Sequence, residues 1–473
     1  MTSVVKTVIP SAELPLVGEA PAQVSTTLLE RLAAGLDQRG VQYCQWKGHW
    51  SSHRWATGHG DVDLLVSRHS LEPFRTLIGE LGFKRVQSPA HQTIPGVESY
   101  LGYDPAVPRL LHLHVHYRLV LGDYWKPVYR LPLADEVLAT SVPGPTFRVP
   151  APTHQFLLFV LRLMLRQVGR PYLSVQTRWT KGVRIPLESL EACSNREELA
   201  LLLARHLPSI DLHFFDRCVA SLRTEGRPID RAMLPWQLHQ RLRSHVRYPS
   251  VKAVLMAIGE KLFPARAHQL SRRHAHPATG GTVLALLGED GAGKSTCARE
   301  LLQWLAPALP ALHVDLGNPP RSFTSLIVGG ALKLQRHLER MLNRSARPDS
   351  LLELVRHLCL ARDRFRLYGR VQRFAAGGGI AVCEHYPIEQ NRSLVGPRIL
   401  EALSGRQRGK SGLARWLGAA EAGYYSRMLG PDAVLVFRLD PELVVQGTSN
   451  LIDAGRPLPE LLQQLKGITW SIL

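Results

Sequence analysis

The stretch LLGEDGAGKST at residues 286–296 constrains the fold of this chain more than any other feature. It follows the spacing G-x-x-x-x-G-K-[ST], and the residues that match or adjoin the motif are Gly288, Gly291, Gly293, Lys294, Ser295 and Thr296. An apolar run at 283–287 precedes it, and CARELLQWL after it has helical periodicity. A strand that turns tightly into a helix points several backbone N–H groups at one place. The stretch therefore predicts a cradle for the phosphates of a nucleoside triphosphate.

The side chains of this loop predict ATP and Mg²⁺ as cofactors. We expect the ammonium of Lys294 to reach the β and γ phosphates and the hydroxyl of Ser295 to ligate Mg²⁺. The glycines Gly288, Gly291 and Gly293 would let the backbone approach the phosphates closely. The motif does not identify the group that accepts a phosphate.

Four apolar segments with strand character alternate with helical segments in the last part of the chain: TVLALLG, ALHVDLG, GIAVCEH and DAVLVFRLD. Strands that are buried on both faces and separated by helices predict a parallel α/β sheet. Pro and Gly residues between the periodic segments mark the expected domain boundaries. These are a flexible tail at 1–25, an α+β domain at 26–150, a helical connector at 151–276, a linker at 277–281 and the α/β domain at 282–473.

The loop has an Asp two residues after its first glycine, and in this it resembles the G-x-D-G-[AS]-G-K-[ST] loop of thymidylate kinases. Three later segments are similar to that family in the same order: LCLARDRFRL at 358–367, AVCEHYP at 381–387 and GPDAVLVFRLDPE at 430–442. The resemblance covers roughly residues 282–445. It implies a nucleoside monophosphate kinase-like fold, a parallel sheet flanked by helices, and phosphoryl transfer from ATP.

The resemblance also assigns roles to charged residues. Arg364 would hold the phosphate, or an equivalent anionic group, of the acceptor, and Asp290 would contact the acceptor. Glu384 would act near Mg²⁺ or near the attacking oxygen, in place of the family's Asp. Asp315 lies near the end of the segment ALHVDLG. It is a weaker candidate for a site residue, because its spacing does not require a ligand there.

Two departures from the family pattern remove positive charge. His385 stands where the family has an Arg after the strand-end acid, so this charge becomes pH-dependent. Where the family has an arginine-bearing lid, the stretch QGTSNLIDAGRPLPE offers only Arg456. A fixed guanidinium usually stabilises the charge that develops in phosphoryl transfer. Its loss predicts a changed acceptor, slow turnover, or both.

The front half contains Asp61 and Asp63 in GHGDVDLLV. On a strand these carboxylates point the same way and can share a divalent metal. With Lys47 and Gly48 upstream and LHLHVHYRL downstream, the arrangement resembles the nucleotidyltransferase superfamily over about residues 28–120. The resemblance implies Mg²⁺ bound by the acidic pair and by a third acid on a neighbouring strand.

The third acid is replaced by His114. An imidazole can bind a metal but brings no negative charge, so we expect weaker Mg²⁺ binding, and both an active and a degenerate transferase remain open. His112, His114 and His116 share one strand face, which would suit a softer metal such as Zn²⁺. Solvated histidines on an exposed face are the simpler interpretation.

Composition narrows the partners and the compartment. The formal net charge of +19 suits nucleic acid, an anionic membrane surface or small phosphorylated substrates. Because the arginines are spread along the chain, nucleic acid is the less favoured partner. Six cysteines without a C-x-x-C pair predict reduced thiols and a cytoplasmic location. No uncharged run approaches the roughly 18 apolar residues of a membrane helix, so no transmembrane segment is expected.

Three functions fit the sequence. The leading one is ATP- and Mg²⁺-dependent phosphoryl transfer to a nucleotide or another small phosphorylated metabolite, beside a nucleotidyltransferase-like domain. The second is nucleic-acid end processing, which the charge favours and the lack of a K-x-D-G ligase motif disfavours. The third is a non-catalytic ATP-binding regulator, which the missing lid arginines favour. The residues do not fix the oligomeric state, and the kinase resemblance is compatible with a dimer.

Overall fold

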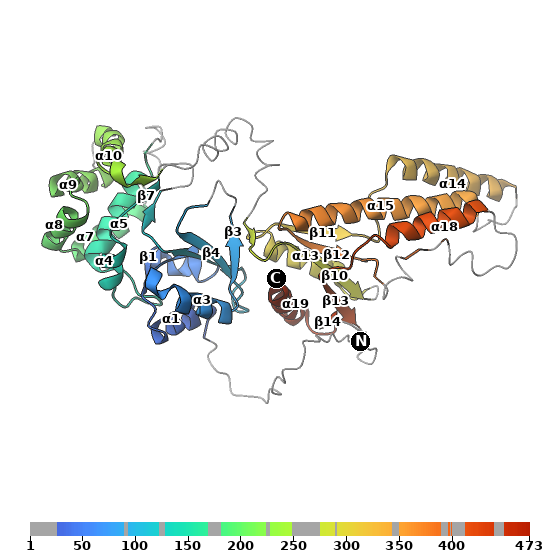
Figure 1. The fold of residues 1–473 in the computed structure, drawn as a ribbon, viewed down its shortest axis with the longest axis horizontal. Helices are drawn as coiled ribbons and strands as arrows, with labels where there is room; N and C mark the ends of the chain where they lie inside the picture. The colour runs from blue at the N-terminus through green and yellow to red at the C-terminus, as the bar shows by residue number, and fades with distance from the viewer. Residues whose placement is uncertain are drawn as a thin grey trace, which may run out of the picture. The chain divides into compact units, whose positions relative to one another are not determined.

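The chain divides between Ala278 and Thr279 into an N-terminal and a C-terminal unit (Figure 1). The computed structural model describes residues 26–88, 93–122, 128–168, 181–223, 228–247, 275–288, 291–342, 350–388, 396–397, 399, 412–438 and 449–473. The expected tail at 1–25 and residues 248–274 of the expected helical connector lie outside these residues.

The N-terminal unit contains a six-stranded mixed sheet with the order β1-β2-β5-β4-β3-β9. Its strands and the two helices on one face are β1 (Tyr43–Lys47), β2 (Asp61–Val66), β3 (Lys84–Gln87), β4 (Val97–Gly102), β5 (Leu111–His116), β9 (His276–Pro277), α1 (Leu28–Gln38) and α3 (Leu71–Glu80). Only β2 and β5 pair in parallel among these strands. Alternation along β2 places Val62 and Leu64 in a core with α1 and α3, so Asp61 and Asp63 face the other side.

Local sequence explains why α1 begins and ends where it does. The Thr27 side chain accepts a hydrogen bond from the Glu30 backbone N–H, and the Glu30 carboxylate accepts one from the Thr27 backbone N–H. This reciprocal pair satisfies two donors at the helix N-terminus. Gly40 follows with φ of 61°, a left-handed conformation that stops the helix.

A layer of helices covers the opposite face of this sheet. The helices are α4 (Ala134–Ala139), α5 (Pro152–Leu165), α7 (Lys181–Cys193), α8 (Arg196–His206), α9 (Leu212–Leu222) and α10 (Pro228–Arg241). Residues 151–276 were expected to be helical, and α5, α7, α8, α9 and α10 lie within that range. Residues of α5, α8 and α9 share one hydrophobic core with Cys44, Trp46 and Leu65 of the sheet. The helices expected as a connector therefore pack on the sheet.

Short elements complete the N-terminal unit. They are η1 (His49–Ser51), α2 (Ser52–Trp55), η2 (Arg68–Ser70), η3 (Arg243–His245) and the strands β6 (Val120–Leu121), β7 (Val128–Arg130) and β8 (Val246–Arg247). The three strands form a small antiparallel sheet in the order β6-β7-β8. Residues far apart in the sequence are thereby brought beside the carboxyl ends of β2 and β5.

The C-terminal unit contains a five-stranded sheet in which every neighbouring pair is parallel. The strands, in the order β11-β12-β10-β13-β14, are β11 (Ala311–Asp315), β12 (Ile380–Glu384), β10 (Thr282–Gly288), β13 (Ala433–Arg438) and β14 (Ser449–Asp453). The helices are α13 (Lys294–Leu305), α14 (Phe323–Met341), α15 (Leu351–Ala376), α18 (Gly412–Tyr425) and α19 (Leu458–Ile472). The expected parallel α/β sheet is confirmed.

Helices bury both faces of this sheet. Val283 and Ala285 of β10 pack with Val371 of α15, and the alternating Leu284 and Leu286 are also fully buried. In Figure 1 α15 lies alongside α14 and α18. The chain leaves β10 toward β11 on one side, whereas β13 and β14 lie on the other side. The carboxyl end of β10 is therefore a point where the strand order reverses, which is where open α/β sheets bind ligands.

None of the helices in the described residues combines the length and the hydropathy that a membrane crossing requires.

Candidate functional site

Three glycines shape the loop between β10 and α13. Gly288 ends β10 with φ of 148°, and a Cβ at this position would lie 2.3 Å from the carbonyl oxygen of Phe437. Gly291 and Gly293 have φ of 90° and 77°, in the region that glycine tolerates best. Gly293 is the N-cap of α13, so the first N–H groups of the helix face the loop. Asp290 lies outside the described residues, and its contact with an acceptor stays a prediction.

Lys294 is the first residue of α13 and is buried. Its Nζ donates a 2.8 Å hydrogen bond to the carbonyl oxygen of Gly288, so the ammonium lies over the loop. Thr296, which adjoins the motif, lies in the first turn of the helix and is exposed. The loop thus combines one ammonium with backbone N–H groups at a helix N-terminus, which is the chemistry that phosphate oxygens require.

Glu384 ends β12 beside this loop and is buried, with 3% of its surface exposed. One carboxylate oxygen accepts a 2.6 Å hydrogen bond from Ser295 Oγ, and the other lies 2.6 Å from His313 Nε2. The hydrogen bond from His313 lowers the pKa of Glu384 despite its burial. An ionised carboxylate beside a hydroxyl provides hard oxygen ligands, so Ser295 and Glu384 fit Mg²⁺.

A second charged pair joins the ends of β11 and β12. Asp315 Oδ1 lies 2.9 Å from His385 Nδ1 and also accepts a 2.8 Å hydrogen bond from the Gly317 N–H. His385 has φ of 51°, and no other non-glycine residue in the described part of the chain has a positive φ. A Cβ on Gly317 would lie 2.9 Å from the His385 ring, so the two segments are tightly packed. Backbone strain of this kind is concentrated at functional sites.

Arg364 of α15 is buried at the carboxyl end of β11. Its Nε donates a 2.7 Å hydrogen bond to the Leu316 carbonyl, and its Nη2 donates one of 3.2 Å to the Gly317 carbonyl. Its Nη1 donates to the hydroxyl of Tyr425. These bonds fix the guanidinium beside the pair of Asp315 and His385. A contact between Arg364 and an acceptor stays a prediction.

The family's lid corresponds to the stretch QGTSNLIDAGRPLPE, and Arg456 is the one arginine in its described residues. Arg456 follows β14, and its Nε lies 3.4 Å from the carboxylate of Asp453. Residues 439–448, which include the expected Asp-Pro-Glu sequence, lie outside the described part of the chain.

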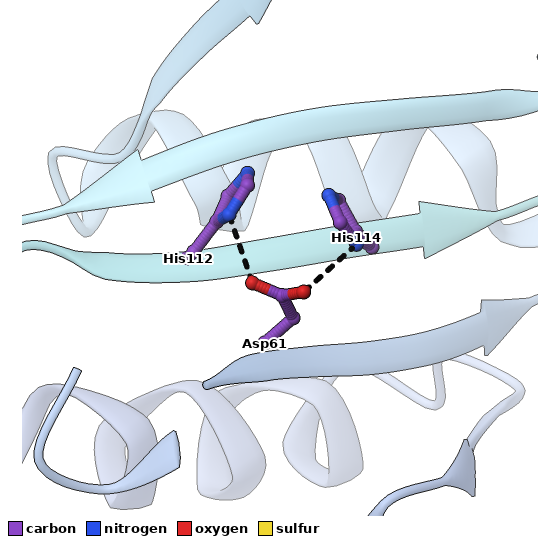
Figure 2. Close-up of side chains that lie close together, drawn as sticks. All are labelled: Asp61, His112 and His114. Atoms are coloured by element: carbon purple, nitrogen blue, oxygen red, sulfur yellow. Dashed lines mark ion pairs between the residues drawn. The ribbon is translucent and has the colours of Figure 1, made fainter. Parts of the chain in front are cut away.

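The N-terminal unit brings Asp61 and His112 together through strand register. β2 and β5 pair in parallel so that Asp61 lies opposite His112 and Asp63 lies opposite His114. Asp61 Oδ1 is 3.0 Å from His112 Nδ1, and its Oδ2 is 3.8 Å from His114 Nδ1 (Figure 2). One potential ligand atom from each of the three residues lies within 4.8 Å of the others.

Asp63 is enclosed by one lysine and two histidines. It is buried, its Oδ1 is 2.9 Å from Lys47 Nζ, and His114 and His116 lie 3.5 Å and 3.3 Å away. Burial alone would raise the pKa of Asp63, but Lys47 and the two histidines hold it well below its usual range. His116 was expected on an exposed face and is instead 5% exposed against Trp46. Burial lowers the pKa of His116 to about 4, so its ring is neutral at pH 7.

The donor set of Asp61, His112 and His114 has one carboxylate oxygen and two imidazole nitrogens. Nitrogen ligands suit Zn²⁺ and related transition metals, whereas Mg²⁺ prefers oxygen. Asp63, the second acid of the expected Mg²⁺ pair, is already paired with Lys47. The described residues therefore fit a transition metal better than Mg²⁺.

The sequence patterns missed His313 as a site residue. It lies two positions before Asp315 on β11, on the strand next to β12. The signal was the alternation in ALHVD, since same-face residues near a strand end meet the end of the neighbouring strand. Its place near a strand end made Asp315 a weak candidate, and nothing in the sequence singled out His313.

No family model matches the sequence, and no curated protein matches it. Among solved structures, the chain is similar to thymidylate kinase from Candida albicans, with 20% identity over 41% of this chain and 78% of that chain. The TM-score is 0.22, which does not establish a shared fold.

Proposed function

We propose that the C-terminal unit transfers the terminal phosphoryl group of ATP to a small acceptor. The observation that carries this proposal is the cluster of Lys294, Ser295 and Glu384 at the carboxyl end of β10, where a buried carboxylate accepts from the loop hydroxyl. A metal-nucleotide site needs these groups close together, and they come from segments about ninety positions apart. A chance glycine turn would not require a buried acid beside it.

The residues of the site divide the work between binding and charge neutralisation. Lys294 and the loop amides would hold the β and γ phosphates in line with the acceptor. Ser295 and Glu384 would hold Mg²⁺, which when bound neutralises charge on the transferred group. His313 keeps Glu384 ionised and oriented through its 2.6 Å contact. Catalysis of this kind depends on positioning and electrostatics.

The acceptor side is proposed to lie near Arg364 and Asp315. The buried guanidinium and the pair of Asp315 and His385 lie together at the ends of β11 and β12. This supports an acceptor that carries an anionic group, as in a nucleotide or another phosphorylated metabolite. Asp290 is proposed to contact the same molecule.

For the N-terminal unit we infer a divalent-metal site made by Asp61, His112 and His114. The separation of their ligand atoms, within 4.8 Å, supports it. That this unit transfers a nucleotidyl group is proposed on the sequence resemblance alone.

A screen with two radiolabels tests both units. Nucleotides, nucleosides and sugar phosphates are offered with γ-labelled ATP, and in parallel with α-labelled nucleoside triphosphates. Transfer of the γ label reports phosphoryl transfer, and transfer of the α label reports the N-terminal unit. We expect γ transfer to at least one phosphorylated acceptor and none with Lys294→Ala. If Mg-ATP does not bind to well-folded protein in calorimetry, the proposal is wrong.

A further inference from the structure

Four arginines converge on one pocket of the N-terminal unit, at the carboxyl ends of β2 and β5. The pocket has a volume of about 660 Å³. Arg68 follows β2, Arg118 follows β5, Arg130 ends β7 and Arg247 ends β8. Four separate elements thus each contribute one guanidinium to the same space.

In the part of the chain that the structure describes, these four guanidinium groups have no acidic partner. Within the described residues, none of the four arginines forms an ion pair or a hydrogen bond with another side chain, and Asp135 is the single acid among the lining residues. The Nε of Arg118 is enclosed without an acceptor in this part of the chain. Desolvation and the nearby charges of Arg130, Arg68 and Arg247 lower the pKa of Arg118. Unpaired like charges repel, so an anion would relieve the repulsion.

The pocket also has apolar walls. Val66, Leu119, Leu131 and Leu138 line it beside the arginines. Its volume lies in the range of about 300–1,000 Å³ that is usual for small-molecule sites. The metal site proposed above is separate, because Asp61 begins β2 and the pocket begins at its last residue, about 16 Å further along an extended strand.

We propose that this pocket binds a small molecule that carries two or more linked phosphate groups. A guanidinium offers paired N–H donors that match phosphate oxygens, and four of them from different sides suit a diphosphate or triphosphate better than a single carboxylate. The apolar walls would receive the organic part of the molecule. This site does not depend on the nucleotide loop of the C-terminal unit.

Calorimetry with inorganic tripolyphosphate tests the proposal. All proteins carry Lys294→Ala, which weakens the nucleotide loop equally in each. The pocket variant adds Arg118→Gln and Arg130→Gln. The matched control adds Arg31→Gln and Arg109→Gln, which remove two exposed arginine charges of the same unit away from the pocket.

We expect the pocket variant to bind tripolyphosphate at least about tenfold more weakly than the control, because it loses charge-assisted hydrogen bonds. We also expect its unfolding temperature without ligand to equal or exceed that of the control, since repulsion is removed. A lower unfolding temperature would show a structural role, and Arg118→Lys with Arg130→Lys, which keeps the charges, should then recover both folding and binding. Equal affinity in pocket variant and control overturns the proposal.

The same variants distinguish a pocket that binds a small ligand from one that binds nucleic acid. If a single-stranded oligonucleotide binds through these arginines with a steep salt dependence while tripolyphosphate does not bind, the pocket is part of a nucleic-acid interface and the proposal is wrong.

Discussion

Ser295 Oγ donates a 2.6 Å hydrogen bond to Glu384 Oε2, which connects the first turn of α13 to the last residue of β12. The two residues are 89 positions apart in the sequence. Parallel pairing of β10 with β12 places Leu286 opposite Glu384, so the carboxylate arrives where the glycine loop begins. Both oxygens of the carboxylate are used, because His313 contacts the other one. These two contacts hold the proposed metal ligand in one orientation.

Glu384→Gln should reduce phosphoryl transfer by about 10²- to 10³-fold, because the amide keeps the size of the side chain but cannot neutralise Mg²⁺. Steady-state turnover of γ-labelled ATP at varied Mg²⁺ measures the effect. Glu300→Gln makes the same chemical change on α13, away from the end of β12, and should leave turnover unchanged. Equal turnover in both variants would exclude Glu384 from the site.

The loop, its strand and its helix could be predicted from the sequence because they are local. Glycines, a lysine and a hydroxyl at fixed spacing leave few alternatives to a strand, a tight loop and a helix. The partners of Glu384 could not be predicted in this way. The contact with His313 depends on the register between β11 and β12, which no local pattern fixes.

Gly288→Ala should destabilise the C-terminal unit by about 2–4 kcal/mol, through a close backbone contact and an unfavourable φ. A Cβ there would lie 2.3 Å from the carbonyl oxygen of Phe437. Hydrogen exchange of peptides from β10 and α13 measures the change within this unit. Gly430→Ala is the matched control, because no atom lies within 4 Å of its added Cβ, and it should cost less than about 0.5 kcal/mol. Similar exchange in the two variants would contradict the tight approach at Gly288.

His114→Asp should raise Mg²⁺ affinity of the N-terminal unit roughly tenfold or more, because it adds a negative charge and an oxygen ligand between the two acids. The parent protein should prefer Co²⁺ or Zn²⁺ through Asp61, His112 and His114. Visible absorption of Co²⁺ and calorimetry with Mg²⁺ report the two preferences. His69→Asp, at an exposed position outside the cluster, is the control. If the N-terminal unit of the parent protein binds Mg²⁺ but does not bind Co²⁺, the assignment of a transition-metal site is wrong.

In the N-terminal unit the sequence predicted the acidic pair and the histidine strand but not their environment. Period-two alternation shows that Asp61 and Asp63 share a face, yet only the packing of α5 and β1 buries Asp63 beside Lys47. The arginine pocket could not be predicted from the sequence for a similar reason. Arg68 and Arg247 are far apart in the chain, and they meet because the small sheet returns β8 to the ends of β2 and β5.

Stability of the N-terminal unit should fall as the pH is lowered below about 6.5, and His154 should be one cause. His154 is 1% exposed on α5, and neither ring nitrogen has a hydrogen-bond partner among the described residues. Burial lowers the pKa of His154 from its usual value of 6.5. Below that pH the unfolded chain binds a proton that the folded chain does not, so the free energy of unfolding decreases with decreasing pH.

His154→Leu removes the group that binds this proton. Between pH 7 and pH 5.5 the free energy of unfolding should therefore fall less in this variant than in the parent, by up to about 1.4 kcal/mol. Urea unfolding at each pH, followed by pulsed hydrogen exchange at one fixed labelling pH, reports on peptides from α5. His213→Leu, at an exposed position of α9, is the matched control and should keep the pH dependence of the parent. If His154→Leu and His213→Leu show the same pH dependence as the parent, protonation of His154 does not contribute to acid destabilisation of this unit.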